Sequence, residues 1–416
     1  MRRGRRLLSL LVGCALATGC TTVHRHDLLP EVKLGEPSFY PTLQAYADAP
    51  IVDGNRVDVL LNGVEIFPAM LAAIRSARAS VNYAQYFFED GLVAGDMVEA
   101  FAERCRAGIA VNILVDGVGS LNMPREYYDY LRRSGCHVAI FRPVGVGLFH
   151  RPNNRNHRRI LVVDGLIGFT GGSGTSRKWM GDGKVKDHWR DTDVRVEGPA
   201  VEWLQAAFAE NWLIATGIAI GGERHFPRPN ATHGKVSVQV VRSSPNAGDS
   251  AMYSTFLIAL SAAERSIRIT NPYLVLDGRF KRVLLDRSRA GVTIEVLVPG
   301  SIDHNFVREA SRASWGEFIR AGIKMYQYMP ALLHAKTIVI DSVWATIGST
   351  NFDNRSFALS DELNVIVYDR DVARRMEAVF AEDLRHSEPV TYEKWKRRGL
   401  KARLFETLVA PLRTLL

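Results

Sequence analysis

The feature that most constrains the fold of this chain is an internal repeat. Residues 106–115 and 289–298 both begin with Arg-Ala-Gly and continue as an apolar run typical of a buried strand. In both places a helical pattern precedes the run, and a further strand and helix precede that pattern. The chain is therefore predicted to contain two copies of one structural unit. Its 416 residues are enough for two domains of ordinary size.

Within each copy, the expected secondary structure alternates between helices and apolar strands. This alternation predicts an α/β fold on a largely buried sheet, with two repeated α/β/α halves related by a pseudo-twofold axis. The polar segment 221–234 reads as the connection between the halves, which we place at 50–215 and 235–390. Helices are expected over 68–78, 95–106, 127–134, 252–264, 278–289 and 313–321, and strands over 80–88, 136–141, 266–275 and 323–328.

The first twenty residues follow the plan of a bacterial secretory signal. Four arginines in residues 1–6 precede an apolar run over 7–16, which is too short to span a bilayer, since a spanning helix needs ~20 apolar residues. The sequence Ala-Thr-Gly before Cys20 resembles a lipobox, in which Cys20 becomes the lipidated first residue of the mature chain. An ordinary cleaved signal and an uncleaved anchor are the alternatives. We expect residues 1–20 to place the protein on the periplasmic side of the cell envelope as a membrane-anchored lipoprotein.

Two further cysteines and the C-terminal tail leave alternatives open. Cys105 and Cys136 could pair in an oxidising compartment, but both lie in patterns that bury them, and we expect two free buried thiols. Residues 391–416 alternate basic and apolar side chains, as a helix does that either lies on a membrane surface or packs its apolar side on the protein. The formal net charge of +9 suits an anionic membrane or a phosphate-bearing substrate without specifying either.

The second half carries the clearest chemical motif. His334 and Lys336 stand two residues apart on an expected strand, so their side chains point to the same face. A histidine beside an ammonium group can hold a phosphate, with the imidazole placed for attack or proton transfer. Asp341 follows at the end of the strand, and the hydroxyl of Ser349 and the amide of Asn351 are predicted to bind non-bridging phosphate oxygens.

The first half repeats this motif with His157, Arg159 and Asp164, followed by Gly-Gly-Ser-Gly at 171–174, where Ser173 is the candidate phosphate ligand. Two copies of a His-x-Lys-x4-Asp pattern followed by Gly-Ser-x-Asn resemble the phospholipase D superfamily. The resemblance covers about residues 55–395. It narrows to the bacterial cardiolipin synthase branch through residues 156–158, 189–193, 196–200, 271–273, 332–337 and 351–356.

The resemblance implies an active site at the interface of the two halves and a phosphohistidine mechanism without a metal or other cofactor. One histidine attacks the phosphodiester while the other protonates the departing alkoxide and later deprotonates an acceptor hydroxyl. We expect His157 to be the nucleophile and His334 to be the general acid and base.

The resemblance also implies a carboxylate behind each imidazole, which fixes its tautomer. By position these are Asp191 for His157 and Glu362 for His334. The motif carboxylates Asp164 and Asp341 are grouped with the catalytic residues, although a structural role is the commoner one for them.

Two residues of the first half depart from the family pattern. Arg159 replaces the motif lysine, which keeps the positive charge in a bulkier, forked group. Gly174 replaces the motif asparagine and removes an amide donor, for which Ser173 or Thr175 is a candidate substitute. Both histidines and both carboxylates remain, so we expect a working but altered site.

The sequence thus predicts a phosphatidyltransferase that makes cardiolipin from phospholipids. Phosphatidylglycerol is the expected substrate, with phosphatidylethanolamine as a second candidate, and no nucleic acid is expected as a partner. The nearest alternative is a phospholipase D that uses water and releases phosphatidic acid. A secreted nuclease of the same superfamily and an inactive lipid-binding protein are more distant alternatives. Nuclease members are typically a single half that dimerises, which the duplicated chain argues against.

Overall fold

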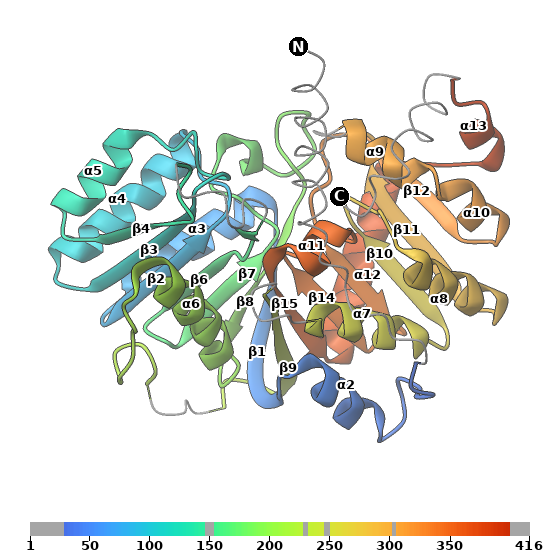
Figure 1. Ribbon diagram of the computed structural model, residues 1–416, viewed down its shortest axis with the longest axis horizontal. Coiled ribbons are helices and arrows are strands. Elements are labelled where there is room, and N and C mark those ends of the chain that lie inside the picture. The colour runs from blue at the N-terminus through green and yellow to red at the C-terminus, as the bar shows by residue number, and fades with distance from the viewer. Residues whose placement is uncertain (1–28, 146–153, 228–231, 245–249, 302–304, 400–416) are drawn as a thin grey trace, which may run out of the picture.

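The computed structural model describes residues 29–145, 154–227, 232–244, 250–301 and 305–399, and it contains the two predicted copies (Figure 1). The first copy comprises β1 (Ile51–Leu61), α3 (Asn62–Ser76), β2 (Ser80–Gln85), α4 (Leu92–Arg106), β3 (Ala110–Asp116), α5 (Arg125–Arg133), β4 (His137–Phe141), β5 (Arg155–Asn156), β6 (Ile160–Val163), β7 (Ile167–Gly171), the 3-10 helix η2 (Arg177–Trp179), β8 (Thr192–Glu197) and α6 (Val201–Thr216). The second copy comprises β9 (Val236–Ser243), α7 (Ala251–Ser261), β10 (Ser266–Thr270), α8 (Gly278–Arg289), β11 (Thr293–Pro299), α9 (Asn305–Arg312), α10 (Trp315–Arg320), β12 (Lys324–Tyr328), β13 (Thr337–Ile340), β14 (Trp344–Gly348), α11 (Asn354–Ala358), β15 (Ser360–Tyr368), α12 (Arg370–Arg385) and β16 (Ser387–Pro389).

The strands of both copies form one sheet whose centre is the junction between the halves. The order is β4-β3-β2-β6-β7-β8-β1 in the first half and β12-β11-β10-β13-β14-β15-β9 in the second. Strands β1 and β9 pair antiparallel at the centre. Because the same order extends outward from this pair on both sides, the two halves are related by a pseudo-twofold axis, as the sequence predicts.

Among the described residues, three large apolar cores hold the helices to this sheet, and a small fourth core packs Phe380 of α12 on β11 and β12. The outer core of the first half lies under α3, α4 and α5, and that of the second half lies under α7, α8 and α10. The third core is shared, because apolar side chains of α6 and α12 pack with strands from both halves; Phe208, Val194, Val365 and Met376 are among its members. The halves are therefore joined by a common core as well as by the sheet.

The aspartate of each histidine motif fastens a neighbouring strand rather than facing the site. Asp164 accepts hydrogen bonds at Oδ1 from the backbone N–H groups of Ala79 and Ser80, at 2.7 and 2.8 Å. Asp341 accepts equivalent bonds from Arg265 and Ser266, both at 2.7 Å. Both aspartates follow the far ends of β6 and β13 and have a φ of 53°, a left-handed conformation that aspartate tolerates. The structure therefore removes Asp164 and Asp341 from the catalytic group.

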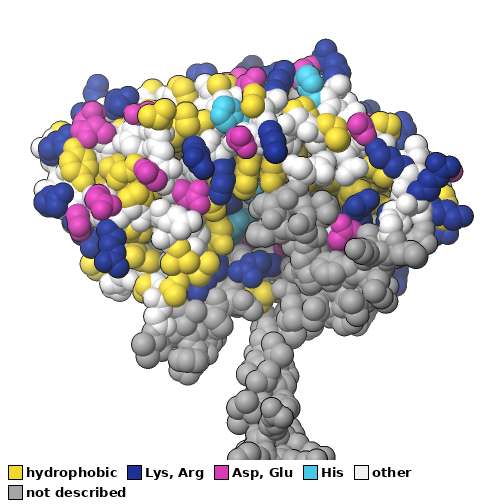
Figure 2. Space-filling model, turned by 90° about the horizontal axis from the view of Figure 1, so that it is seen from above, with side chains coloured by type: hydrophobic (Ala, Val, Ile, Leu, Met, Phe, Trp, Pro, Cys, Tyr) yellow, Lys and Arg dark blue, Asp and Glu magenta, His cyan; other side chains and the backbone are white. Residues whose placement is uncertain are grey.

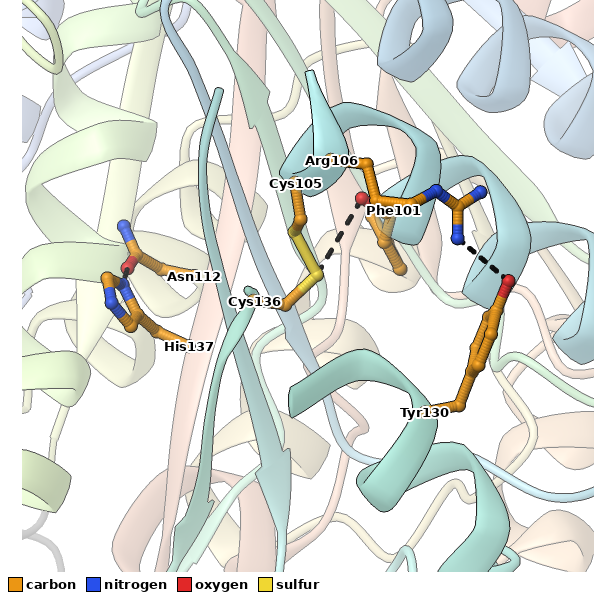
Figure 3. The surroundings of a disulfide bond; sticks show 7 residues. All are labelled: Phe101, Cys105, Arg106, Asn112, Tyr130, Cys136 and His137. Carbon is orange, nitrogen blue, oxygen red and sulfur yellow. Dashed lines mark hydrogen bonds between the residues drawn. A yellow bond between two sulfur atoms is a disulfide. The ribbon is translucent and has the colours of Figure 1, made fainter. Parts of the chain in front are cut away.

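The expectation of free buried thiols is wrong, because Cys105 and Cys136 form a disulfide (Figure 3). Their Cα atoms are 5.4 Å apart, within the usual range for such a bond. Cys105 lies in the last turn of α4 and Cys136 immediately precedes β4. The α/β packing of the first half brings these two positions together, which sequence patterns alone did not show.

Short helices lie at both ends of the described chain. Before the first half, α2 (Phe39–Ala47) packs on α7 of the second half. After the second half, α13 (Tyr392–Lys396) begins the basic tail, and Trp395 donates from Nε1 to the carbonyl of Arg312 at 2.8 Å. The start of the tail thus packs on the protein, while residues 400–416 and the signal segment with Cys20 lie outside the described residues. Within the described part, no helix has the length and apolar character needed to cross a membrane.

Candidate active site

The histidine of each motif is held by the backbone of the opposite half. Strand β5, which immediately precedes His157, pairs with the start of β15 in the second half. The N–H of His157 donates to the carbonyl of Asp361 at 2.9 Å, and the N–H of His334 donates to the carbonyl of Arg190 at 2.8 Å. The two motifs therefore meet at the pseudo-twofold axis, where the sequence predicts the interface site.

The carboxylates behind the histidines are exchanged relative to the prediction. Nδ1 of His157 lies 2.8 Å from Oε1 of Glu362, and Nδ1 of His334 lies 2.8 Å from Oδ2 of Asp191. Both carboxylates are buried. The sequence-based pairing within each half is wrong, because each histidine crosses the axis to a carboxylate of the other half, Glu362 in β15 or Asp191 just before β8. With Nδ1–H donating to a carboxylate, Nε2 of each ring carries the lone pair.

A cation lies beside each imidazole. One guanidinium nitrogen of Arg159 lies 3.2 Å from Nε2 of His157, and the other donates to the carbonyl of His157 at 2.8 Å. Nζ of Lys336 lies 2.9 Å from Nε2 of His334. Both cations are buried. Arg159 thus occupies the place of the motif lysine, and its Nε is buried without a hydrogen-bond partner among the described residues.

Both histidines border a single cleft with a cavity volume of about 320 Å³. A cleft of this size accommodates the head groups of large ligands. Aromatic side chains form much of its wall, and Tyr86 contacts the ring of His157 edge-on at 5.0 Å. The other lining residues are Phe87, Val118, Gly119, Arg155, Arg159, Trp179, Trp189, Tyr273, Asn351, Asp353, Arg355, Ser356 and Ser360.

Burial and neighbouring cations keep both imidazoles neutral. Burial first, and then the charge of Arg159, lowers the pKa of His157 well below its ordinary value. Burial and the charge of Lys336 lower the pKa of His334 to about 4, although Asp191 opposes the shift. A neutral imidazole is the form that attacks phosphorus. An anionic phosphodiester in the cleft offsets the charges of Arg159 and Lys336, which favours protonation of the histidine that acts as the acid.

The two supporting carboxylates differ in their protonation. Burial raises the pKa of Glu362 to about 7, with the hydrogen bond from Ser349 opposing the shift. Burial also acts to raise the pKa of Asp191, but the charge and hydrogen bond of His334 outweigh it and hold that pKa below its ordinary value. The Glu362–His157 pair therefore takes up a proton near neutrality, whereas Asp191 remains ionised.

The three predicted phosphate ligands occupy different environments. Ser349 donates its hydroxyl hydrogen to Glu362, and Ser173 donates its own to Asp193 at 2.5 Å. Because a hydroxyl has one hydrogen, neither is free to donate to a phosphate. Asn351 lines the cleft, where its Nδ2 amide group is the donor that a phosphate oxygen would accept from. The geometry thus leaves Asn351 as the predicted amide ligand and places the two serines behind the site.

Trp179 fills the space left by the altered first-half motif. The equal motif spacing matches Gly172 to Ser349 and Gly174 to Asn351. A Cβ on Gly174 would lie 2.7 Å from the Trp179 ring, so the indole excludes an asparagine there. Nε1 of Trp179 donates to Oδ2 of Asp191 at 2.8 Å, as Ser349 donates to Glu362. The indole N–H therefore supplies the carboxylate support that a serine supplies in the second half.

Sequence reasoning missed several residues of the cleft. Trp179 lacks a motif of its own and is recognised only through its contact with Asp191. Arg155 lies two residues before His157, at the start of β5. Asp353 and Arg355 fall within 351–356, a stretch that supported the family resemblance, but the sequence assigned them no role.

Comparisons with known proteins agree with this geometry. Residues 70–212 and 256–384 match the family model described as cardiolipin synthase, PLD-like domain. Cardiolipin synthase 1 of Bacillus cereus is 31% identical over 401 residues, which cover 93% of this chain and 79% of that protein. The major cardiolipin synthase of Bacillus subtilis is 31% identical over 367 residues, covering 86% of this chain and 75% of that protein.

Solved structures show the same fold at low sequence identity. Phosphatidylserine synthase of Haemophilus influenzae superposes with a TM-score of 0.70 at 11% identity, covering 91% of this chain and all of that one. Polyphosphate kinase of Porphyromonas gingivalis superposes with a TM-score of 0.54 at 13% identity, covering 95% of this chain and 57% of that one.

Proposed function

The chain belongs to the cardiolipin synthase family with phospholipase D-like domains, and we propose that it transfers a phosphatidyl group from one phospholipid to the hydroxyl of another, giving cardiolipin. The observation that carries this proposal is the pair of histidines in one cleft, each backed by a buried carboxylate from the other half. Such a pair supplies a nucleophile on one side of a phosphodiester and a proton donor on the other.

In the first step, Nε2 of His157 attacks the phosphorus of the donor lipid. The bond from phosphorus to the head-group oxygen breaks as the phosphorus–nitrogen bond forms. His334, protonated at Nε2 once the phosphodiester is bound, gives that proton to the departing alkoxide. Arg159, Lys336 and Asn351 lie where they can stabilise the non-bridging oxygens as charge develops.

In the second step, the now neutral His334 takes a proton from the acceptor hydroxyl. The hydroxyl oxygen attacks phosphorus, the phosphorus–nitrogen bond breaks, and His157 returns to its neutral form. With phosphatidylglycerol as both donor and acceptor, the products are cardiolipin and glycerol. With water as acceptor, the same steps give phosphatidic acid, so the phospholipase D alternative differs only in the acceptor.

Product analysis tests this proposal. Purified mature protein is incubated with phosphatidylglycerol, alone and with phosphatidylethanolamine, and the lipids are separated and identified. We expect cardiolipin that disappears in both His157→Ala and His334→Ala variants. Phosphatidic acid alone would indicate a hydrolase, and no turnover of any phospholipid would favour the nuclease or the inactive lipid-binding protein.

We propose that the enzyme works at the periplasmic side of the envelope, anchored through lipidated Cys20. The Cys105–Cys136 disulfide supports an oxidising compartment. Seen from above, lysine and arginine side chains are spread over the face and its rim, among acidic and hydrophobic side chains (Figure 2). The formal net charge of +9 suits an anionic lipid surface. Intact mass of the membrane-extracted protein tests the anchor: we expect a diacylglyceryl adduct that a Cys20→Ser variant lacks, with the variant recovered in the soluble fraction.

A further inference from the structure

Two arginines in the cleft have no part in the steps above. Arg155 lies at the start of β5, and Arg355 lies in α11, yet both line the cleft that contains His157. Strand pairing sets Arg155 directly opposite Ser360, another lining residue. The four elements that supply Arg155, Arg355, Ser360 and Tyr86 thus converge beside the nucleophile.

Arg155 and Arg355 add two cations to the two that stand beside the imidazoles. A donor phosphodiester carries one negative charge, and Arg159 and Lys336 already stand beside the two imidazoles. Within the described part of the chain, Arg355 has no carboxylate at ion-pair distance. Its neighbour Asp353 does not compensate it fully near neutrality, because burial raises the pKa of Asp353 to about 7.

Arg155 is partly compensated, and its position is fixed. Its guanidinium lies 3.9 Å from Asp116 and donates to the carbonyl of Arg142 at 2.8 Å. Burial raises the pKa of the Tyr86 phenol. The charges of Arg355, Arg159 and Arg155 oppose this rise, so all three cations lie near the phenol. These cations therefore surround one part of the cleft wall and are not dispersed around its rim.

We propose that Arg355 and Arg155 form a subsite for the phosphodiester of the acceptor lipid. This inference rests on the proposed function, because only a phosphatidylglycerol acceptor brings a second phosphate into the cleft. That phosphate is joined to the attacking hydroxyl by a single glycerol unit, so the site must hold two phosphodiesters at once. Guanidinium groups bind phosphate oxygens in a fork geometry, and Ser360 and Tyr86 offer hydroxyl donors next to them.

The subsite explains how this cleft selects lipid transfer over hydrolysis. Water needs no second anion site, so binding the acceptor phosphate accelerates attack by the lipid hydroxyl alone. A neutral alcohol such as 1-propanol carries no phosphate, so the subsite does not accelerate its attack either. Loss of the subsite should therefore change the partition between acceptors while leaving formation of the phosphohistidine intact.

An acceptor-partition experiment with Arg355→Gln tests this. Phosphatidylglycerol in mixed micelles is offered with 1-propanol, and cardiolipin, phosphatidylpropanol and phosphatidic acid are quantified together. We expect cardiolipin formation to fall about tenfold, the size typical of losing one charge-assisted hydrogen bond, with phosphatidylpropanol and phosphatidic acid retained. Arg355→Lys should restore part of the cardiolipin. Arg133→Gln, on the exposed side of α5, is the matched control and should leave all three products unchanged.

Three results would overturn the subsite. Equal loss of all three products in Arg355→Gln, with an unchanged melting temperature, would show that Arg355 serves the donor phosphate or the chemistry itself. Unchanged cardiolipin in both Arg355→Gln and Arg155→Gln would show that the acceptor phosphate binds elsewhere. Wild-type protein that forms phosphatidylpropanol but no cardiolipin would remove the proposed function together with the subsite, whereas the first two results leave cardiolipin synthesis in place.

Discussion

At the scale of single residues, the two histidines are distinguished by their surroundings. The side chain of His157 is 14% exposed and lies near Tyr86 and Arg355, whereas that of His334 is 7% exposed and lies between Trp179 and Trp189. The more open ring is better placed to carry a bulky phosphatidyl group, which agrees with the assignment of His157 as nucleophile.

A substrate with a good leaving group separates the two roles. Phosphatidyl-p-nitrophenol releases nitrophenolate without a proton donor, so His334→Ala should still form the phosphohistidine and then stop. We expect His334→Ala to release one equivalent of nitrophenolate in a burst and His157→Ala to release none. Stopped-flow absorbance measures this release. A burst from His157→Ala and none from His334→Ala would reverse the assignment.

Trp179 and Ser349 should affect different steps, because they support different carboxylates. Ser349→Ala removes the donor to Glu362 behind His157, and Trp179→Phe removes the donor to Asp191 behind His334. With the nitrophenyl substrate, Ser349→Ala should slow the burst about tenfold, and Trp179→Phe should slow only the later turnover by a similar factor. Each variant is the control for the other, and the same effect of both on the burst would contradict the crossed arrangement.

Sequence alone could not give this crossed arrangement. The spacing from histidine to aspartate to glycine is identical in the two halves, so it identifies the motif residues but not which half each side chain faces. Pairing across the axis depends on β5 meeting β15 and on the contact of Leu333 with Arg190, which are tertiary features. The same limit applies to Trp179, whose role depends on space left by Gly174.

At the scale of helices and strands, the sequence was more informative. The helix expected over 278–289 is observed as α8 with the same bounds, because Asp277 caps its first turn and Gly291, at a φ of 91°, follows its end. The helix expected from Pro68 instead begins at Asn62, and Pro68 lies in the second turn of α3. Periodicity thus located the elements, while their ends depended on local hydrogen bonds.

The disulfide is expected to stabilise the first half substantially. It closes a loop of 31 residues between α4 and β4, for which the loss of unfolded-chain entropy predicts ~3–4 kcal/mol. The Cys105→Ala/Cys136→Ala variant should therefore unfold at lower urea concentration, by about 2–4 kcal/mol in unfolding free energy. Reductant should shift the wild type to the same extent and leave the variant unchanged. An effect of reductant on the variant would show that another thiol is responsible.

The motif aspartates should affect stability rather than chemistry. Asp341 accepts hydrogen bonds from backbone N–H groups just before and at the start of β10, and its removal leaves those partly buried donors without their carboxylate partner. We expect Asp341→Ala to lower the unfolding free energy by about 1–3 kcal/mol per donor left unsatisfied, with the rate of nitrophenolate release per folded molecule preserved. Asp164→Ala is the parallel variant. Full stability combined with lost turnover would restore a catalytic role.

At the scale of the whole molecule, neither half contains a complete histidine–carboxylate pair. The first half supplies His157 and Asp191, the second supplies His334 and Glu362, and each histidine is bonded to the carboxylate of the other half. The shared core and the β1–β9 pairing join the same two halves. Duplication has therefore produced one catalytic unit, not two sites in series.

Splitting the chain tests this unity. Residues 29–227 and 232–399, expressed as separate chains, should each expose the apolar face that forms the shared core, and each should be inactive on phosphatidyl-p-nitrophenol. Co-expression should restore a 1:1 complex with measurable turnover, because no described residue of the connection between the halves lines the cleft. Co-expression with His157→Ala in one fragment is the matched control and should form the complex without turnover. Turnover by either fragment alone would show that one half can assemble a site without the carboxylate of the other.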